Sequence, residues 1–566
     1  MLRAWHCRYD PGVPYKGVYP AWTLLDLLER SVARYGNNPA LFFYGTWLSY
    51  RALDDLTTRF ALSLQALGVE PGDRVAIMLP NCPQAFIAYY GALRAGAVVV
   101  LINPLFVARE IQTVVEDSGS GTILALDLFY PRVRDIARAG RVKRIILTSL
   151  REFLPPLRRL LYPLKLRLSG RAVHVNRREP VLALQALLRK PPTDRPAILP
   201  VVKPDDLALL QYTGGTTGTP KGAMLTHRNL VTNTQQCRLW VPDFQEGREV
   251  FLGVVPFFHA YGLSTCQHLA VMTGSTMILL PRFDVREALR AISRHRVSIF
   301  SGIPAMFMAM NDYPQVGRYN LRSLRVCLSG ASPLHAEVRN RFERLTGVKI
   351  SEGYGLTEAS PVTHCNPVYG ERPDGAIGVP FPDTDCRVVD QETGRRELPP
   401  GEVGELVVRG PQIMQGYWNK PEETAAVLRD GWLYTGDLVR QDRTGFFYLV
   451  DRKKDMIKSR GENVYPREVE EVLFTHPLVK DAVVVGIPDV HLGEAVKAFV
   501  VPVDGQTLTE ADLIAHCQQW LGRFKVPTRI EFRTALPRNL VGKVLRRVLR
   551  EEEMARVLAE GLSRRA

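Results

Sequence analysis

A glycine- and threonine-rich segment at residues 212–222 most constrains what this chain can fold into. It reads Tyr-Thr-Gly-Gly-Thr-Thr-Gly-Thr-Pro-Lys-Gly and follows a short apolar run at 207–211, which we predict to be a buried strand. Glycine lets backbone N–H groups turn toward a ligand, and a loop of such groups binds anions, above all phosphate. The P-loop of common nucleoside triphosphatases needs Ser or Thr after Gly-Lys, whereas Gly222 follows Lys221 here. We therefore predict a different phosphate loop; the alternative is a flexible surface turn.

Apolar strands alternate with helical stretches on both sides of this segment, which indicates parallel βαβ units. The expected strands are 40–44, 75–79, 97–102, 117–125 and 144–148 before it, and 251–255, 276–280, 297–302 and 325–329 after it. A region rich in β-strands follows between 386 and 450. We predict an α/β fold in which a large N-terminal domain has α/β layers, parallel sheets and a β-rich subdomain.

The second domain is expected after a short charged run at 451–455, which lies between two apolar strands and is the predicted hinge. A chain of 566 residues is too long for one hydrophobic core. We place the N-terminal domain at 1–450 and a small α+β C-terminal domain at 451–566, with a last helix at 543–558.

The composition limits which binding partners and which cellular compartment are expected for the protein. The net charge of +15 favours acidic partners, namely nucleotides, CoA, anionic lipid or nucleic acid, without choosing among them. No recognised nucleic-acid motif is present and the basic residues are dispersed, so we expect no nucleic acid. Eight scattered cysteines with no C-x-x-C pair argue against zinc and disulfides. With no apolar run that could span a bilayer and no secretory signal, a cytoplasmic protein is expected.

Residues 151–180 contain leucines at spacings of three and four together with arginines and lysines, and Glu152 is the single acid among residues 151–171. Such a basic amphipathic segment can lie on an anionic membrane, so weak peripheral association through 151–171 is one hypothesis. The alternative, which we favour, is a surface helix that packs on its own domain. Pro155, Pro156 and Pro163 are expected to break any continuous helix here.

Three further segments carry groups that suit a nucleotide. The turn Gly-Tyr-Gly-Leu-Thr-Glu at 353–358 offers an aromatic platform, a hydroxyl and a carboxylate. Asp437 follows a glycine turn, where it can accept hydrogen bonds from ribose hydroxyls or merely satisfy its own turn. Lys543 follows Gly542 near the C-terminus, and its alternative role is that of a solvated lysine at the start of a helix.

Taken in order, these segments resemble those of the adenylate-forming superfamily, which contains acyl-CoA and aryl-CoA ligases, luciferases and the adenylation domains of peptide synthetases. The likeness runs from about residue 20 to 555. It implies a nucleotide site formed by Thr213, Gly214, Gly215, Thr216, Thr217, Gly218, Thr219, Lys221, Gly330, Ala331, Ser332, Gly353, Tyr354, Gly355, Thr357, Asp437, Arg452, Lys454, Lys458 and Lys543.

The resemblance also implies specific roles for some of these residues. The catalytic residues are Lys543, Glu358, Thr213 and Lys221, and Thr213 and Glu358 hold Mg²⁺. Tyr354 stacks on adenine.

CoA is expected at a second group of residues. The CoA-binding set is Lys458, Arg460, Gly461 and Glu462. The implied reaction couples a carboxylate to the α-phosphate of ATP, releases pyrophosphate, and then transfers the acyl group to the thiol of CoA. Between the two steps the C-terminal domain is expected to swing about Lys453 and Lys454.

The acyl pocket of this family lies between the phosphate loop and the Gly-Tyr-Gly turn. Its candidate residues are His259, Tyr261, Gly262, Leu263, Gly302, Ile303, Pro304 and Pro361. No Arg or Lys occurs in the segments 256–263, 301–304 and 359–362 that contain them, so a second carboxylate on the substrate would be buried unpaired. Small residues leave room for an elongated apolar group.

Several features resemble bacterial long-chain fatty acid–CoA ligases in particular, including Gly214 in the loop and the insertion at 151–180. One position differs, because some long-chain enzymes gate the pocket with a tryptophan where this chain has Leu263. A medium-chain or aryl-carboxylate CoA ligase is therefore the main alternative, and a non-catalytic acyl-adenylate-binding module is an alternative from another class. The sequence does not report oligomeric state, and a homodimer is one expected assembly.

Overall fold

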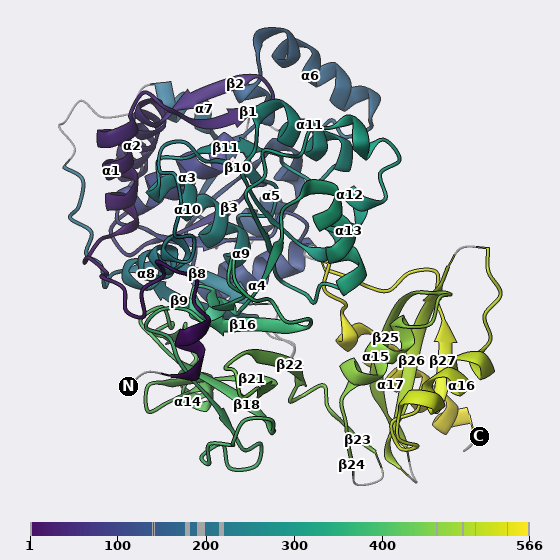
Figure 1. Ribbon diagram of the computed structural model, residues 1–566. Coiled ribbons are helices and arrows are strands. Elements are labelled where there is room, and N and C mark those ends of the chain that lie inside the picture. Colours follow the sequence, from purple (N-terminus) through teal and green to yellow (C-terminus); the bar gives the residue numbers. More distant parts are fainter. Residues whose placement is uncertain are drawn as a thin grey trace. The chain divides into compact units, whose positions relative to one another are not determined.

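The computed structural model describes residues 3–138, 140, 142–175, 181–189, 198–213, 220–459, 462–489, 492–503, 505–539 and 542–563. The chain forms two compact units (Figure 1). Unit 1 comprises residues 1–374, 378–385 and 409–433, and unit 2 comprises 375–377, 386–408 and 434–566. Within the described ranges, no helix combines the length and the apolar character needed to cross a membrane.

An eight-stranded sheet in unit 1 carries the glycine- and threonine-rich segment. Its strands, in spatial order, are β19 (Gly416–Tyr417), β9 (Lys221–Thr226), β8 (Leu207–Thr213), β4 (Val98–Leu101), β3 (Arg74–Met78), β5 (Thr122–Leu126), β6 (Arg144–Thr148) and β7 (Val181–Ala183). The strands from β8 to β7 are parallel, whereas β9 and β19 are antiparallel to their neighbours. The continuous apolar runs of β3, β4 and β5 suit strands that are covered on both faces.

A second sheet of unit 1 carries the Gly-Tyr-Gly turn and the candidate acyl residues. Its strands, in spatial order, are β2 (Thr46–Ser49), β1 (Pro39–Phe43), β11 (Thr276–Leu279), β10 (Val250–Gly253), β12 (Ile299–Gly302), β13 (Val326–Ser329), β14 (Ile350–Gly355), β15 (Val362–Cys365) and β16 (Ala376–Pro380). β1 and β10 to β14 are parallel, so the carboxyl ends of β12, β13 and β14 meet at one edge.

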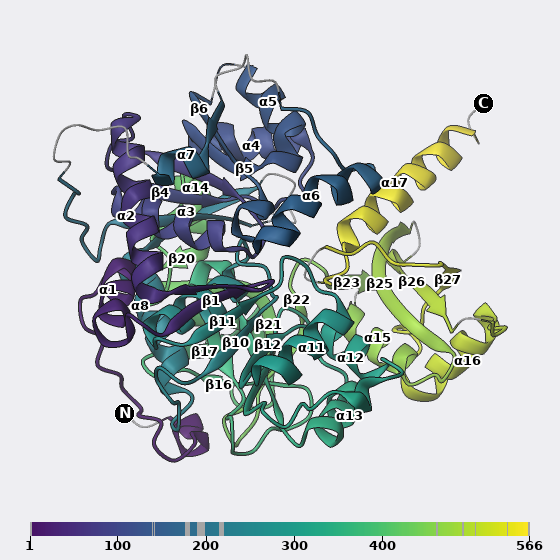
Figure 2. The same cartoon turned by 90° about the horizontal axis from the view of Figure 1, so that it is seen from above.

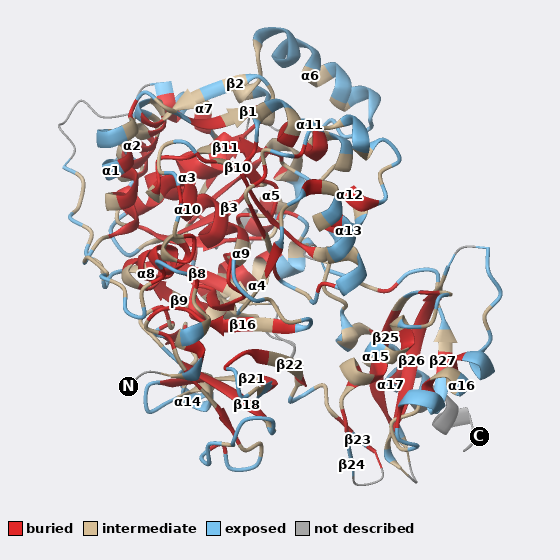
Figure 3. Ribbon diagram, viewed as in Figure 1, coloured by how far each residue is buried: buried red, intermediate tan, exposed pale blue. Residues whose placement is uncertain are grey.

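Helices cover both sheets of unit 1 (Figure 2). They are α1 (Leu24–Tyr35), α2 (Tyr50–Ala66), α3 (Pro83–Arg94), α4 (Ala108–Ser118), α5 (Tyr130–Arg138), α6 (Pro156–Leu168), α7 (Leu184–Arg189), α8 (His227–Leu239), α9 (Ala260–Gly262), α10 (Leu269–Met272), α11 (Val285–His295), α12 (Pro304–Asn311), α13 (Ala336–Thr346) and α14 (Pro421–Val427). A π-helical turn, η4, spans Leu263–His268, and a 3₁₀ turn, η6, spans Thr357–Ala359. α3 is buried along its whole length, and the strands and α3 form the core that Figure 3 shows in red.

Unit 2 combines a small β-rich region, in which β21 and β22 pair antiparallel, with a five-stranded sheet. The first contains β17 (Asp385–Val389), β18 (Val403–Arg409), β21 (Trp432–Gln441) and β22 (Phe447–Arg452). The five-stranded sheet contains β23 (Ile457–Ser459), β24 (Glu462–Val464), β25 (Val479–Asp489), β26 (Gly493–Pro502) and β27 (Arg529–Phe532). Its helices are α15 (Pro466–Phe474), α16 (Glu510–Trp520) and α17 (Arg546–Ser563). Apolar side chains on the two faces of β25 and β26 form separate clusters, one with α15 and α16 and one with α17.

The predicted fold class is confirmed, with two local corrections. The strand expected at 117–125 is the end of α4 followed by β5, because Gly119 adopts a left-handed conformation that ends the helix. Pro163 lies inside α6 without breaking it. α6 lies at the surface with none of its 13 residues fully buried, and it contacts its own unit through the half-buried Tyr162 and Leu166 and a 2.7 Å hydrogen bond from Arg158 to the Tyr44 carbonyl.

Candidate active site

The described arms of the glycine- and threonine-rich segment form an antiparallel hairpin. β8 ends at Thr213 and β9 begins at Lys221, and these two residues are paired across the hairpin. The Thr213 hydroxyl donates a hydrogen bond of 3.4 Å to the Lys221 carbonyl. A Cβ on Gly222 would lie 3.0 Å from the Tyr212 ring, so a larger residue would require the ring to shift by a few tenths of an ångström. The predicted residues 214–219 (Gly214, Gly215, Thr216, Thr217, Gly218 and Thr219) lie outside the described residues.

Glu358 lies beside this hairpin through contacts with β19. The Tyr417 hydroxyl donates a hydrogen bond of 2.7 Å to Glu358 Oε1, and the Met414 N–H donates one of 2.8 Å to the Glu358 carbonyl. Lys221 Nζ lies 5.3 Å from the centroid of the Tyr417 ring, within reach of a cation–π interaction. Tyr417 therefore joins two of the predicted catalytic residues.

Sequence reasoning missed Tyr417, and its only signal was an aromatic hydroxyl beside Gly416. Gly416 has φ of 146°, and a Cβ there would meet the side chain of Thr424 at 2.6 Å. Burial and the neighbouring Glu358 carboxylate raise the pKa of Tyr417 well above its usual value. The phenol therefore stays protonated at neutral pH and can donate its hydrogen bond to Glu358.

Thr213 and Glu358 suit a magnesium ion better than a metal held entirely by protein. Within the described ranges, no group of three or more His, Cys, Asp or Glu side chains could hold a metal ion. Mg²⁺ is commonly bound by one or two carboxylates and completes its octahedron with waters and substrate phosphates. One carboxylate held by Tyr417, beside the arms of the predicted phosphate loop, fits that pattern.

The Gly-Tyr-Gly turn is built at the end of β14. Tyr354 pairs with His364 of β15, and the two rings are 5.7 Å apart in an edge-to-face arrangement. A Cβ on Gly355 would lie 2.1 Å from the Pro361 carbonyl oxygen, so no other residue fits there without a backbone shift. Gly353 lies in the same strand, and Thr357 follows in η6 beside Glu358.

The next strand, β13, ends beside this turn and leads into another predicted nucleotide segment. Gly330, Ala331 and Ser332 follow β13 directly, and Ala331 has a left-handed φ of 71°. β13 pairs with β14 in parallel, so this segment leaves the sheet at the same edge as the Gly-Tyr-Gly turn. Ligands of open α/β sheets bind outside the carboxyl ends of the strands, which is where these residues lie.

Tyr261 brings the candidate acyl residues to that edge. Its hydroxyl lies 3.1 Å from the Gly302 carbonyl and 3.3 Å from the Leu328 carbonyl, at the ends of β12 and β13. A Cβ on Gly330 would meet the Tyr261 ring at 3.1 Å, and one on Gly262 would meet the Pro256 carbonyl at 2.4 Å. Burial raises the pKa of Tyr261 well above its usual value, so the ring contributes a neutral surface.

The other candidate acyl residues surround Tyr261 in the chain or join it through η4. His259 Nδ1 accepts a hydrogen bond of 3.3 Å from the Tyr261 N–H. The Ser264 hydroxyl donates to the Ser360 carbonyl over 2.7 Å, which links η4 to the turn before Pro361. The remaining residues are buried or begin a helix: Leu263, Ile303 and Pro304.

Unit 2 gathers a separate group of predicted residues. Asp437 of β21 pairs with Arg452 of β22, and Arg452 Nε lies 3.2 Å from Asp437 Oδ1. Lys543 is half-buried and shares their electrostatic environment. Burial lowers its pKa to about 7, and the positive charges of Arg452 and Lys454 act in the same direction. The Asp437 carboxylate opposes this shift without cancelling it.

Lys543 lies in a turn. The alternative role, that of a solvated lysine at the start of a helix, would have placed it in α17. The Lys543 N–H donates to Asn539 Oδ1 and the Asn539 N–H donates to the Lys543 carbonyl, both over 2.9 Å. α17 begins three residues later, at Arg546. The expected helix at 543–558 is therefore displaced, and Lys543 is positioned by a closed turn.

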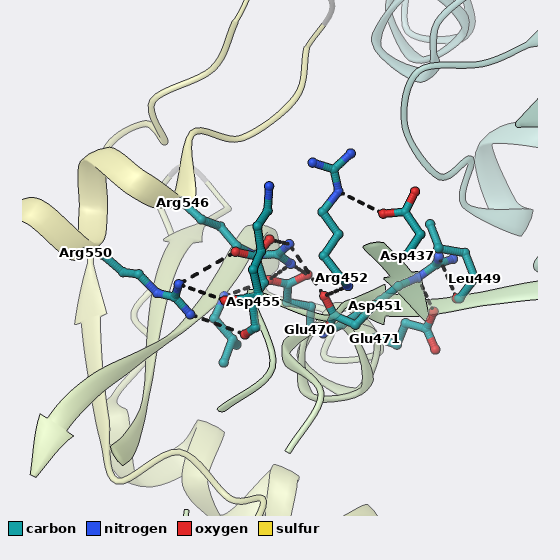
Figure 4. Close-up of polar contacts among 12 residues, drawn as sticks. Asp437, Leu449, Asp451, Arg452, Asp455, Glu470, Glu471, Arg546 and Arg550 are labelled. Atoms are coloured by element: carbon teal, nitrogen blue, oxygen red, sulfur yellow. Dashed lines mark hydrogen bonds and ion pairs between the residues drawn. The ribbon is translucent and has the colours of Figure 1, made fainter. Parts of the chain in front are cut away.

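The predicted hinge is contacted by α17 (Figure 4). Arg550 donates one hydrogen bond of 3.3 Å to the Lys454 carbonyl and another of 3.3 Å to the Asp455 carbonyl. Of the predicted CoA residues, Lys458 and Glu462 are exposed in the β23–β24 hairpin. Arg460 and Gly461 lie outside the described residues.

Comparison with protein-family models identifies both parts of the chain. A model described as AMP-binding enzyme matches residues 28–418, and one described as AMP-binding enzyme C-terminal domain matches residues 468–543. The chain belongs to the AMP-binding enzyme family. The second match ends at Lys543, and the first includes the hairpin, the Gly-Tyr-Gly turn and Tyr417.

Other AMP-binding enzymes are similar to this one over nearly their full length. A long-chain-fatty-acid–CoA ligase of Bacillus subtilis is 44% identical over 97% of this chain and 98% of its own. A ligase of the same name from Yersinia pestis is 38% identical over 98% and 99%. A feruloyl-CoA synthase of an Amycolatopsis species is 37% identical over 89% and 93%.

Solved structures agree with this assignment. ATP-bound MatB from Rhodopseudomonas palustris matches with a TM-score of 0.81 and 29% identity, covering 94% of this chain and 99% of its own. The o-succinylbenzoate CoA synthetase of Bacillus subtilis, in complex with its acyl-adenylate, matches with a TM-score of 0.77 and 28% identity, covering 92% and 97%.

Proposed function

We propose that this AMP-binding enzyme is a long-chain fatty acid–CoA ligase. It would use ATP to convert the fatty acid to an acyl-adenylate and then transfer the acyl group to CoA, giving acyl-CoA, AMP and pyrophosphate. The observation that carries the proposal is the 44% identity, over 97% of the chain, to a long-chain-fatty-acid–CoA ligase.

The candidate acyl residues support an uncharged, elongated substrate tail. The segments 256–263, 301–304 and 359–362 contain no Arg or Lys that could pair with a second carboxylate. Tyr261 Oη already lies within hydrogen-bond distance of two backbone carbonyls, so the ring would offer the substrate an apolar surface. Each methylene buried there would contribute about 0.8 kcal/mol, or roughly a fourfold gain in affinity.

In the first step a carboxylate oxygen attacks the α-phosphorus of ATP, and the bond to pyrophosphate breaks. The reactants carry several negative charges, so the protein mainly positions them and stabilises charge. Lys221 and the loop between β8 and β9 would bind phosphate, and Tyr354 would stack on adenine. Asp437 would accept hydrogen bonds from the ribose hydroxyls, while Arg452 and Lys543 would neutralise charge at the α-phosphate and the carboxylate.

Glu358 and Thr213 are the residues that would hold Mg²⁺, which would supply positive charge to the phosphates when bound. Tyr417 would keep the Glu358 carboxylate in place for this role through the 2.7 Å hydrogen bond.

In the second step the thiolate of CoA attacks the carbonyl carbon of the acyl-adenylate and AMP leaves. Lys458, Arg460, Gly461 and Glu462 would lie along the CoA arm at this stage. The C-terminal part, from the hinge at 451–455 onward, would change its orientation between the two steps.

A substrate panel tests the proposal directly. Purified protein receives ATP, Mg²⁺, CoA and saturated acids from short to very long, and AMP release is measured. We expect the apparent Michaelis constant to fall with each added methylene until the pocket is full. If none of the acids yields pyrophosphate at any concentration of Mg²⁺ and CoA, the proposal is refuted.

A medium-chain or aryl-carboxylate CoA ligase is the second candidate, and the relationship to a feruloyl-CoA synthase favours including it. Adding octanoate, benzoate and ferulate to the same panel separates the candidates by kcat/KM. A non-catalytic binding module would instead retain a supplied acyl-adenylate without releasing pyrophosphate. Sedimentation equilibrium tests the expected homodimer.

We also infer that the protein is cytoplasmic and associates weakly with anionic membranes through residues 151–171. Five leucines of α6 are more than half exposed: Leu157, Leu160, Leu161, Leu164 and Leu168. The same helix carries Arg158, Arg159, Lys165 and Arg167 and no acidic residue. A basic helix with an exposed apolar face can bury leucines at an acyl boundary while its cations attract anionic lipid.

Vesicle sedimentation tests this contact. Wild type should bind vesicles of anionic lipid at low salt and fail to bind neutral ones. Replacing Leu160, Leu161 and Leu164 with serine should remove binding without lowering the melting temperature, because these side chains are exposed. Equal binding by the leucine variant, or no binding by wild type, would contradict the inference.

A further inference from the structure

Arg546, the first residue of α17, lies among three carboxylates (Figure 4). Its Nη2 atom lies 2.7 Å from both carboxylate oxygens of Glu470 in α15. Its Nη1 atom lies 3.7 Å from Asp455 and 4.0 Å from Asp451. One guanidinium therefore joins α17, α15, the end of β22 and the predicted hinge.

Arg546 is suited to this place because the surrounding acids are largely buried. The side chain of Asp451 is 2% exposed and that of Glu470 is 12% exposed. Burial alone would lower the pKa of Arg546, but Glu470 and Asp451 raise it above its usual value. The guanidinium thus stays charged, and its planar fork can meet several carboxylates at once.

The contacts of Asp451 make Arg546 relevant to the nucleotide residues. Asp451 immediately precedes Arg452 in β22 and accepts a 2.8 Å hydrogen bond from the Arg467 N–H of α15. Arg467 Nη1 also donates to the Leu449 carbonyl over 2.9 Å. Arg546 lies three residues after Lys543, so its ion pairs fix the turn that carries Lys543 against the strand that carries Arg452.

We propose that Arg546 is a positioning residue that holds Lys543 at the Asp437–Arg452 pair for the adenylation step. The proposal rests on the proposed function, because it assigns Lys543 to that step. Thioester formation from an acyl-adenylate does not use Lys543 in the proposed reaction. Loss of the Arg546 clamp should therefore slow the first half-reaction selectively.

The test variant is R546Q combined with E470Q, since removing Arg546 alone would leave its nearest carboxylate, Glu470, charged and unpaired and would endanger folding. The matched control is R547Q, whose side chain is half exposed and pairs with the exposed Glu551 at 3.5 Å. Pyrophosphate release with a long-chain acid reports adenylation. AMP release from a synthetic long-chain acyl-adenylate and CoA reports the second step.

We expect the double variant to lose at least tenfold in kcat for adenylation and to stay within twofold of wild type in thioester formation. R547Q should match wild type in both. R546K in the native background should recover only part of adenylation, because an ammonium cannot bridge the same carboxylates. An unchanged adenylation rate in the double variant, or an equal loss of both half-reactions, would overturn the proposal.

A readout that needs no turnover separates this inference from the proposed function. Tryptic cleavage at residues 452–454 should accelerate in the double variant and remain unchanged in R547Q, because the clamp holds α17 on the hinge. If wild type releases no pyrophosphate with any acid, the proposed function fails. Unchanged cleavage in the double variant would overturn the clamp itself.

Discussion

Lys543 should impose an alkaline limit on adenylation. Its pKa is lowered to about 7 by burial and by Arg452 and Lys454, so the ammonium loses its proton as pH rises through neutrality. In pyrophosphate release, kcat/KM for ATP, which reports the free enzyme, should fall about tenfold per pH unit above that pKa. Below it the lysine is charged and the rate should level off.

The variant K543R distinguishes Lys543 from other titrating groups. An arginine stays charged across this range, so K543R should be slower than wild type yet show no alkaline decline near pH 7. The same decline in K543R and wild type would assign the limit to another group.

The hydroxyl of Tyr417 should affect how tightly Mg²⁺ is bound for adenylation. In Y417F the Glu358 carboxylate loses a hydrogen bond of 2.7 Å, and bonds to charged groups contribute about 1.5–3 kcal/mol. The Mg²⁺ concentration for half-maximal adenylation should rise about tenfold or more. Electron paramagnetic resonance of Mn²⁺ with a non-hydrolysable ATP analogue measures the same loss without turnover.

The control for that loss is Y44F. Tyr44 donates a 2.9 Å hydrogen bond to Glu287 in the same way, but neither residue belongs to the predicted site. Y44F should leave the metal requirement unchanged, and a similar shift in both variants would refute a specific role for Tyr417.

At the scale of the element, the turn after β14 tolerates only glycine at 355. In G355A the new Cβ would lie 2.1 Å from the Pro361 carbonyl oxygen, so the backbone that leads to Thr357 and Glu358 must move. We expect adenylation to fall at least tenfold and the melting temperature to drop. G317A, where no heavy atom lies within 4 Å of the new Cβ, should change neither quantity.

α6 shows how the residue pattern of an element can be predicted while its continuity is mistaken. The spacing of its leucines and its cationic character followed from the sequence, but the prolines suggested a break. Pro155 and Pro156 instead stand at the start of the helix, where a missing N–H is tolerated, and Pro163 is accommodated within it. Whether the leucines were covered depended on neighbours that are distant in sequence.

At the scale of the whole molecule, the hinge should separate the two half-reactions. In K454P the fixed φ of proline restricts rotation at the predicted pivot. Pyrophosphate release should stay near the wild-type rate, and thioester formation should slow at least tenfold. K454A, which removes the same side chain but leaves the backbone free to rotate, is the control for the loss of the lysine itself. Equal loss of both half-reactions in K454P would refute the pivot.

The α/β class and most strands of unit 1 were predictable because apolar runs separated by helical stretches are local signals. Glu358, Tyr354, Lys543 and the segment predicted to be a phosphate loop also stand out in the sequence, because they lie in short motifs of unusual composition, and their roles stay predictions. Tyr417 and Arg546 were not predictable in this way. Their importance comes from partners far away in the chain, such as Glu358 for Tyr417 and Glu470 for Arg546.

The sequence by itself determined which chemical groups are present and on which local elements they lie, because turns, strands and caps are set by neighbouring residues. The tertiary structure alone decided which of those groups meet and how they are charged. It placed Lys543 in a half-buried turn beside two other cations, and burial there lowers its pKa to about 7. Burial and electrostatic neighbours depend on the packing of distant segments, which no local pattern specifies.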